Sequence, residues 1–319
     1  MQLSFRALLY MVETADAGSV TEAARRLGVT QPSISAVLGQ VEKELGYPIF
    51  VRHHARGVTL SAAGERLMAE ARHLLGHARD FGQLAVSLGD PLSGEIHVGA
   101  FSSLAMRYMP WLIAAFSRLY PQITIRLTDG NQQVILDGLA SGGLELALSY
   151  DFALTAELEA TELAELPPYI LLSASHPLAG ASILSLHDLA DEPLILLDLP
   201  HSRDYFLGLF AQCGITPRIF IRSQSSEIVR GLVGNGLGYA LRNVLPQSRV
   251  GYDGSVISVA EIKEQLEPVR INLLHLARSE LRPAAKAFSD FIRAAFAPGG
   301  AFAQRTSAYP PHRHMSGEP

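Results

Sequence analysis

One long helical pattern between Ala62 and Leu88 divides the chain into two unequal parts. Its apolar residues recur at alternating spacings of four and three, which is a heptad seam, and Ser61 is placed to cap it. Asp90-Pro91 ends the pattern. A seam of this length favours a helix that pairs with a second subunit; the alternative is a core helix of the next domain. The seam consists of Leu67, Ala71, Leu74, Ala78, Phe81, Ala85 and Leu88.

Three short helices are predicted before the long one. The first spans Phe5 to Ala15 and ends at Gly18, a residue type suited to a helix C-terminus. The second begins with Ser19 and has Glu22 three residues later, which predicts a capping box. The third begins after Thr30, a predicted N-cap, and has Pro32 in its first turn.

A two-stranded wing is predicted between the third helix and the long helix. The runs 49–51 and 58–60 are rich in residues that favour strands. They enclose the segment 52–57, which carries Arg52, Arg56 and a turn glycine.

The outer face of the third helix is made of small and polar residues. Such a face lets the backbone approach the major groove of DNA, where amides and hydroxyls read base edges. Arginines on the wing can reach flanking phosphates or the minor groove. An ordinary packing unit of three helices is the alternative. The predicted DNA contacts are Thr30, Gln31, Pro32, Ser33, Ser35, Ala36, Gln40, Arg52 and Arg56.

The overall charge does not itself predict a nucleic-acid partner. The chain has 26 Lys and Arg against 31 Asp and Glu, and residues 19–60 hold only five basic against three acidic residues. DNA binding must therefore be local. A single cysteine excludes an internal disulfide, and no cofactor or metal is expected. Without a signal peptide or an apolar stretch long enough to span a bilayer, the chain is expected to be cytoplasmic, with no membrane partner.

Beyond residue 94, strand-like and helical stretches alternate along about 200 residues. This alternation predicts an α/β domain with largely parallel sheets, and its size favours two lobes around a cleft. The predicted strands are 95–100, 123–128, 144–149, 169–174, 194–198, 218–222, 238–241 and 270–277, and the predicted helices are 104–120, 132–141, 203–213, 227–233 and 283–296.

The N-terminal sequence resembles that of LysR-type transcriptional regulators. SVTEAARRLGVTQPSIS at 19–35, VEKELGYPIFVR at 41–52 and RGVTLSAAGE at 56–65 carry the resemblance. Weaker likeness continues through 94–99 and Tyr120-Pro121. Many members have a long polar side chain directly after the serine of the recognition helix, where this chain has Ala36. We therefore expect a DNA contact to be missing there or to move to Gln40.

The resemblance implies a fold of α plus α/β type with three parts. These are a winged helix-turn-helix over 1–60, a linker and dimerisation helix over 61–90, and a two-lobed sensor similar to type 2 periplasmic binding proteins over 91–297. Lobe I is expected over about 91–165 and 267–297, lobe II over about 166–266, and a disordered tail over 298–319.

The resemblance also implies the partners of the chain. Members usually assemble as homotetramers built from homodimers and bind an interrupted inverted repeat in double-stranded DNA. A small effector in the interlobe cleft alters DNA bending and contact with RNA polymerase. A solute-binding protein and an enzyme with its site in the cleft are the rival interpretations. The first lacks a signal peptide, and the second lacks a recognisable catalytic motif.

Several polar helix starts follow predicted strands of the sensor. Hydroxyls and unpaired N–H groups at such positions suit a small anion, and nearby aromatics, including Phe206 and Tyr239, suggest an aromatic or other apolar carboxylate. Simple helix capping and core packing are the alternatives. The predicted effector residues are Ser102, Ser103, Asn131, Gln132, Tyr150, His201, Ser202, Tyr205 and Ser225.

Overall fold

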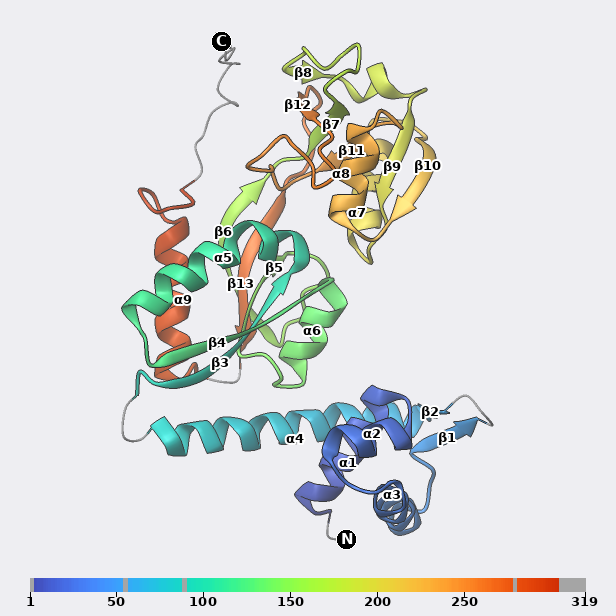
Figure 1. The fold of residues 1–319 in the computed structure, drawn as a ribbon, viewed down its shortest axis with the longest axis vertical. Helices are drawn as coiled ribbons and strands as arrows, with labels where there is room; N and C mark the ends of the chain where they lie inside the picture. Colours follow the sequence, from blue (N-terminus) through green and yellow to red (C-terminus); the bar gives the residue numbers. More distant parts are fainter. Residues whose placement is uncertain (1–2, 54–56, 88–90, 278–279, 304–319) are drawn as a thin grey trace.

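The computed structural model shows an N-terminal helical unit, one long helix and two α/β lobes (Figure 1). It describes residues 3–53, 57–87, 91–277 and 280–303. In Figure 1 the N-terminal unit and the long helix lie at the bottom, lobe I lies above them, and lobe II lies at the top.

The N-terminal unit contains the three predicted helices and the predicted wing. These are α1 (Phe5–Ala17), α2 (Val20–Leu27), α3 (Gln31–Leu45), β1 (Phe50–His53) and β2 (Gly57–Leu60). β1 and β2 pair antiparallel. The core of the unit includes Met11, Ile34 and Leu38, which are almost completely buried.

Two predicted caps form differently from the expectation. Ser19 accepts a hydrogen bond from the backbone N–H of Glu22, but the Glu22 carboxylate pairs with Arg25 and Arg26, so the capping box is only half formed. Thr30 makes no side-chain capping bond to the backbone of α3. Pro32 lacks one of the two N–H groups that a cap could satisfy, and the Thr30 hydroxyl lies 2.7 Å from the Ser33 hydroxyl instead.

The long helix α4 (Ala62–Ser87) belongs partly to the N-terminal core. Ser61 accepts from the backbone N–H of Gly64 at 3.0 Å, as predicted. Of the seam residues, Ala71 is buried and Leu67 partly buried beside Met68 in the N-terminal core, so the first part of the heptad seam packs within the chain. Leu74 and Phe81 are 48% and 72% exposed. The side chain of Ala85 and all of Leu88 lie outside the described residues.

A close backbone contact at Gly76 joins α4 to lobe I. A Cβ atom on Gly76 would lie 2.8 Å from the carbonyl oxygen of Ser141 and 2.9 Å from the Cα of Gly142. Only glycine permits this approach. The contact places the end of one lobe I helix directly against the long helix.

Lobe I is a mixed five-stranded sheet with helices on both faces. It contains β3 (Gly94–Phe101), α5 (Ser102–Leu119), β4 (Ile123–Gly130), α6 (Gln132–Ala140), β5 (Leu146–Tyr150), β6 (Leu158–Leu166), β13 (Val269–Leu276) and α9 (Pro283–Phe296). The strand order is β4-β3-β5-β13-β6; the pairs of β3 with β4 and β5 are parallel, whereas β13 runs antiparallel to β5 and β6. α5 and α9 contribute to one apolar cluster and α6 to another.

Lobe II is less parallel than the sequence predicted. It contains β7 (Tyr169–Ser173), β8 (Ile183–Leu184), the 3-10 helix η1 (Leu186–Leu189), β9 (Pro193–Leu197), α7 (Ser202–Gln212), β10 (Arg218–Ser223), α8 (Ser226–Gly234), β11 (Ala240–Arg242) and β12 (Ile257–Ile262). β9 and β10 pair parallel, but β7 is antiparallel to both β11 and β12. The expectation of largely parallel sheets is therefore wrong for this lobe.

Three strands, β6, β8 and β12, were not predicted. β6 has the sequence LEATELAEL, in which residues that favour helices predominate. Its pairing with β13 along almost its whole length holds it extended. Tertiary hydrogen bonding overrides the local preference here.

The beginning of the C-terminal tail packs on lobe I. The ring of Phe302 lies 4.9 Å from that of Tyr108, 5.1 Å from that of Trp111 and 5.2 Å from that of Phe296, measured between centroids. Disorder beginning at residue 298 is therefore the wrong expectation for 298–303, while 304–319 lie outside the described residues. No helix within the described ranges combines the length and the apolar character needed to cross a bilayer.

A buried ion pair ties α9 to the sheet of lobe I. Arg282 donates from two nitrogens to the two carboxylate oxygens of Glu145, both at 2.8 Å, and to the carbonyl oxygen of Glu95 at 2.7 Å. The side chains of Arg282 and Glu145 are only 10% and 11% exposed. Removing one partner would leave the other charge buried without compensation.

Arg282→Met is therefore expected to lower the free energy of unfolding by about 3–5 kcal/mol. Urea denaturation followed by circular dichroism measures this change. Lys286→Met is the matched control, because Lys286 pairs with Asp290 at the surface and such pairs contribute about 0–1 kcal/mol. Equal losses in the two variants would contradict the structural role of the buried pair.

Candidate functional site

The outer face of α3 is exposed along its first ten residues. Ile34, Leu38 and Val41 point into the N-terminal core. On the opposite side the surface is formed by Gln31, Pro32, Ser33, Ala36, Gly39 and Gln40, all exposed, and by the partly exposed Ser35. The helix therefore presents small and polar groups outward, as the sequence predicted.

The polar side chains of this face are held by neighbours on the same helix. The Gln31 amide donates to the Ser35 hydroxyl at 2.9 Å, and the Gln40 amide donates to the Glu44 carboxylate at 2.8 Å. The hydroxyls of Thr30 and Ser33 lie 2.7 Å apart. Amide and hydroxyl groups one turn apart are thus oriented together on the exposed surface.

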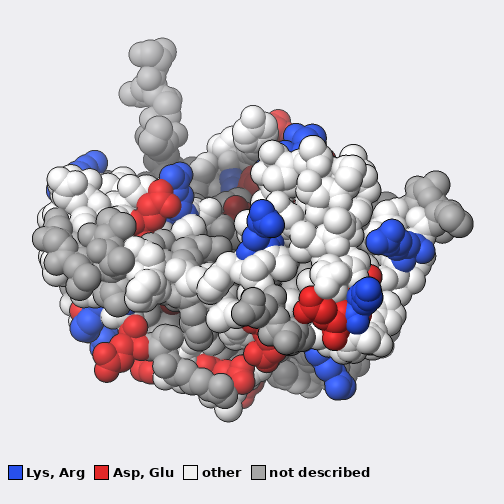
Figure 2. Space-filling model, turned by 90° about the horizontal axis from the view of Figure 1, so that it is seen from below, with Lys and Arg blue, Asp and Glu red and all other residues white. Residues whose placement is uncertain are grey.

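Basic residues near α3 are few and scattered. Arg52 is exposed on β1, opposite Val58 of β2, while Arg56 lies outside the described residues. In Figure 2, the view from below Figure 1, Lys and Arg are interspersed with Asp and Glu instead of forming one continuous patch. Recognition of a partner by this face therefore depends on where its few polar groups are placed, and the overall charge contributes little to it.

Two arginines of α2 are already engaged by carboxylates. Glu22 accepts from Arg25 at 2.7 and 2.8 Å and from Arg26 at 3.0 Å, and Arg26 also reaches Glu13 at 3.2 Å. These hydrogen bonds from Arg25 and Arg26 lower the pKa of Glu22 to about 2. Glu22 thus stays ionised at neutral pH and neutralises basic groups close to α3.

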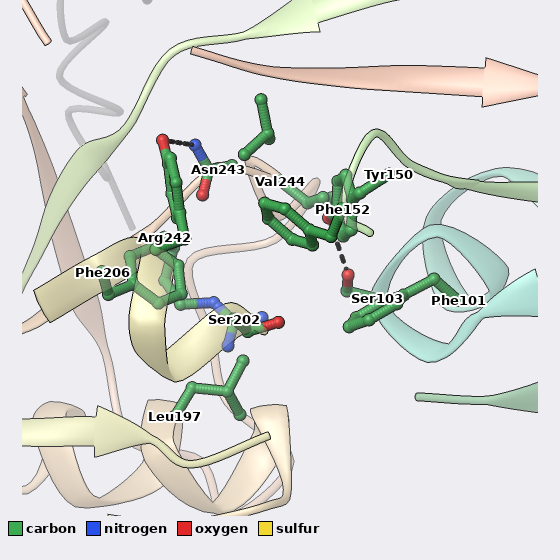
Figure 3. A pocket seen from close by; sticks show the side chains of 12 residues that line it. Phe101, Ser103, Tyr150, Phe152, Leu197, Ser202, Phe206, Arg242, Asn243 and Val244 are labelled. Atoms are coloured by element: carbon green, nitrogen blue, oxygen red, sulfur yellow. Dashed lines mark hydrogen bonds between the residues drawn. The ribbon is translucent and has the colours of Figure 1, made fainter. Parts of the chain in front are cut away.

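A second candidate site lies where lobe I faces lobe II (Figure 3). The enclosed volume is about 20 Å³, which is room for about one water molecule. A small-molecule site needs about 300 Å³ or more, so a ligand requires the lobes or their side chains to move apart. The pocket is lined by Phe101, Ser103, Tyr150, Phe152 and Val269 of lobe I and by Leu197, Ser202, Tyr205, Phe206, Arg242, Asn243 and Val244 of lobe II.

Four of the nine predicted effector residues line this pocket: Ser103, Tyr150, Ser202 and Tyr205. The hydroxyls of Ser103 and Tyr150 are 2.9 Å apart (Figure 3). Burial raises the pKa of Tyr150 far above its usual value, against the opposing effects of the Ser103 hydrogen bond and the Arg242 charge. Tyr150 is therefore a neutral phenol at physiological pH.

The other five predicted residues lie outside the pocket lining. Ser102 donates to Asp129, and the side chains of Asn131 and Ser225 cap α6 and α8. Gln132 is fully buried. Its amide nitrogen donates to the carbonyl oxygens of Tyr150 and Phe152 at 3.2 and 2.8 Å, and its carbonyl accepts from Ser149 at 2.7 Å. Gln132 thus fixes the loop that carries two lining aromatics.

His201 shapes the pocket through its backbone. Its φ of 64° and ψ of −42° lie where a residue with a Cβ atom is strained. The N–H of Ser202 donates to the carbonyl oxygen of Pro200 at 2.8 Å, which closes a tight turn around His201. This turn starts α7 so that Ser202 and Tyr205 reach the pocket. The second described residue other than glycine with positive φ, Ala153, directly follows the lining residue Phe152.

Tyr239 does not contribute to an aromatic wall of the pocket. It is 1% exposed within the core of lobe II, and its ring lies 6.3 Å from that of Phe210. Phe206 does line the pocket, as predicted. The sequence places Tyr239 next to β11, and only the packing of that strand shows that its ring points into the core.

A row of aromatic rings crosses from lobe I to lobe II. Ring centroids are separated by 4.8 Å between Phe101 and Tyr150, 5.5 Å between Tyr150 and Phe152, 5.6 Å between Phe152 and Tyr205, and 5.2 Å between Tyr205 and Phe206. The Phe152–Tyr205 contact joins the two lobes. Any planar ligand that enters between the lobes must separate or replace this contact.

Tyr205 and Asn243 bind both chain segments that connect the lobes. The Tyr205 hydroxyl donates to the carbonyl oxygen of Glu267 at 3.0 Å and accepts from the Asn243 amide at 3.0 Å. The same amide donates to the carbonyl oxygen of Leu166 at 3.0 Å. Burial raises the pKa of Tyr205 to about 12, so its hydroxyl remains a donor at neutral pH. The position of lobe II relative to lobe I is therefore coupled to the pocket residues Tyr205 and Asn243.

The sequence analysis missed most of the lobe II side of the pocket. Arg242, Asn243 and Val244 come at and directly after the end of β11. The strand was predicted to end at residue 241, so Arg242 fell just beyond it. A charged side chain directly after an apolar strand was the available signal.

Comparison with known proteins agrees with this geometry. Residues 5–65 match the family described as "Bacterial regulatory helix-turn-helix protein, lysR family", and residues 89–297 match "LysR substrate binding domain". The chain belongs to the LysR family of transcriptional regulators. The fold expected from the sequence, a helix-turn-helix followed by a two-lobed effector-binding domain, is confirmed.

Three relatives illustrate the extent of the likeness. HinK, a LysR-family regulator of Pseudomonas aeruginosa, is 37% identical, with a TM-score of 0.64 over 95% of this chain and all of its own. The HTH-type transcriptional regulator YnfL of Escherichia coli is 30% identical over 78% of this chain and 84% of its own. Full-length CbnR in complex with its target DNA is 24% identical and shares the fold, with a TM-score of 0.63 over 91% of this chain and 99% of CbnR.

In this LysR-type regulator, releasing Arg25 and Arg26 should strengthen binding to DNA of any sequence. Glu22→Gln removes the carboxylate that engages both arginines, so each arginine becomes free to contact a DNA phosphate. Each added contact should steepen the slope of log K against log [salt] by about 0.9. Fluorescence anisotropy on random duplexes over a salt series measures this. Glu65→Gln is the control, because Glu65 is exposed and forms no ion pair with described residues. The same slope in both variants would refute the assignment.

Proposed function

We propose that this chain is a ligand-responsive, DNA-binding transcriptional regulator whose effector, an aromatic or other apolar carboxylate, binds between the lobes. One observation carries the proposal: a single chain presents the exposed polar face of α3 and a polar, aromatic-lined pocket between two lobes. A solute-binding protein has no use for the first feature. The relatives are transcriptional regulators.

The proposed DNA contacts combine α3 and the wing. α3 enters the major groove through Thr30, Gln31, Pro32, Ser33, Ser35, Ala36 and Gln40, while Arg52 and Arg56 reach phosphates or the minor groove. The low bulk charge supports this mode, because sequence reading then depends on placed amides and hydroxyls. The solved complex of CbnR with its target DNA supports the general arrangement for this fold.

The proposed dimer contact uses the later part of α4. Leu74, Ala78, Phe81 and Phe5 of α1 line one apolar surface, and Phe5, Leu74 and Phe81 are exposed large apolar side chains in the single chain. This supports a division into a DNA-binding unit at 1–60, a linker helix at 61–90 and an effector-binding domain at 91–297. Two such subunits present two α3 helices to an interrupted inverted repeat, and two dimers form the proposed homotetramer.

The proposed response begins in the pocket and passes through α6. Gln132 at the start of α6 holds the loop of Tyr150 and Phe152, while Ser141 and Gly142 beyond its end lie against Gly76 of α4. A ligand that displaces the loop therefore acts on an element in contact with the linker helix. The resulting change in the angle between α3 pairs alters DNA bending and contact with RNA polymerase.

Footprinting of the region upstream of the gene tests DNA recognition. Gln31→Ala and Ser35→Ala should each weaken specific binding by about 1–3 kcal/mol, with a smaller effect on random DNA. Gln133→Ala is the control, since its amide likewise bonds a residue one turn later, Asp137, but on α6. A protected site that the two α3 variants bind as tightly as wild type would disprove this mode. The absence of any protected site would disprove the proposed function.

Charge placed on the apolar surface of α4 tests the proposed assembly. Leu74→Asp together with Phe81→Asp should shift the chain toward monomer, because both side chains are largely exposed in the single chain and a dimer would have to bury the new charges. Light scattering measures the mass. Leu119→Asp, at a 63% exposed position at the end of α5, is the control. Unchanged mass in the double variant would argue for another interface.

A further inference from the structure

Arg242 is a buried cation with incomplete pairing. The residue is 8% exposed at the end of β11 and lines the interlobe pocket. One terminal nitrogen donates to the Ser226 hydroxyl, and the other, Nη1, is buried without a hydrogen-bond partner. Within the described residues no carboxylate pairs with this guanidinium. Among those residues, its charge is therefore uncompensated.

A buried charge of this kind is unfavourable for folding. Desolvating a guanidinium costs several kcal/mol unless hydrogen bonds and an opposite charge offset the loss. Arg282, buried to a similar degree, has that compensation from Glu145. The Arg242 guanidinium has only the Ser226 hydroxyl as a hydrogen-bond partner among the described residues. A buried charge that lowers the stability of the folded protein is typical of a site where a ligand supplies the missing partner.

We infer that Arg242 binds the carboxylate of the effector and makes the pocket selective for singly charged anions; this inference rests on the proposed interlobe effector site. The guanidinium presents paired N–H donors that match the two oxygens of a carboxylate. In Figure 3 its side chain reaches into the middle of the lining residues. Nη1 is the donor that such a ligand would satisfy.

The rest of the lining sets the charge and shape of that ligand. Among the described lining residues Arg242 is the only charged one, and no carboxylate joins it. A second negative charge on the ligand would lie unpaired beside aromatic rings, and a cation would face the guanidinium. The phenol of Tyr150, protonated because burial raises its pKa, adds a neutral donor. The site thus fits one carboxylate attached to a planar apolar group.

The full-length protein tests this with paired ligands. Benzoate, phenylacetate, 3-phenylpropionate and indole-3-acetate are each compared with the corresponding primary amide, and isophthalate and benzylamine provide a dianion and a cation. At a concentration about 100-fold above its own Kd, an acid should raise Tm by about 5–10 °C. The other compounds are used at the same concentration as the acid. Amides, the dianion and the cation should raise it by at least threefold less.

Arg242→Met separates ligand recognition from a structural role. Removing an uncompensated buried charge should leave the Tm of the ligand-free protein unchanged or higher, and should abolish the shift caused by acids. Arg282→Met is the matched control: it should lower Tm but preserve the acid-induced shift. Arg242→Lys should keep the preference for acids over amides while weakening binding at least tenfold.

Any one of the following outcomes would overturn the inference. One is a loss of Tm in Arg242→Met as large as in Arg282→Met. Another is an equal shift by acids and amides, or a shift by acids that survives in Arg242→Met. The last is no shift by any of the four acids. In each case DNA footprinting is unaffected, so failure of this inference is distinguishable from failure of the proposed function.

Discussion

The lobes are joined by only two chain segments, and the pocket depends on this constraint. The chain passes from β6 to β7 and returns from β12 to β13, so few covalent links fix lobe II relative to lobe I. Noncovalent contacts at the pocket must then set the closure. Tyr205 and Asn243 bond to the carbonyl oxygens of Glu267 and Leu166, one on each connection. The residues that line the pocket are thus also those that hold the lobes together.

One helix, α6, also links the pocket to the long helix α4. α6 begins with Gln132, which supports the pocket loop, and is followed by a turn packed against Gly76. Because a short helix moves as a rigid unit, a displacement of the start of α6 also displaces its end. Strain at His201 and the unpaired nitrogen of Arg242 lie at the facing side of the pocket. Unfavourable local arrangements therefore gather where lobe II meets lobe I, as is common at functional sites.

The N-terminal unit was predictable because its signals are local. Glycines at the ends of α1, α2 and α3 have the left-handed conformation that stops a helix, and apolar spacing identified the buried face of α3. Lobe II was harder. β6 has a helix-like composition, and β12 gave no sufficient signal of its own. Both are strands because partners distant in the chain, β13 and β7, satisfy their backbone hydrogen bonds.

By itself the sequence determined the LysR-type organisation, the exposed polar face of α3 and five residues of the interlobe pocket, since strand ends and helix starts can be recognised from neighbours in the chain. Only the tertiary structure decided which side chains share the pocket. It sent Gln132 to support a loop, buried Tyr239 in a core, and brought Arg242 to face Tyr150 across the lobes. The physical reason is that a side chain's direction and its loss of solvent depend on packing between segments far apart in sequence, which local patterns do not record.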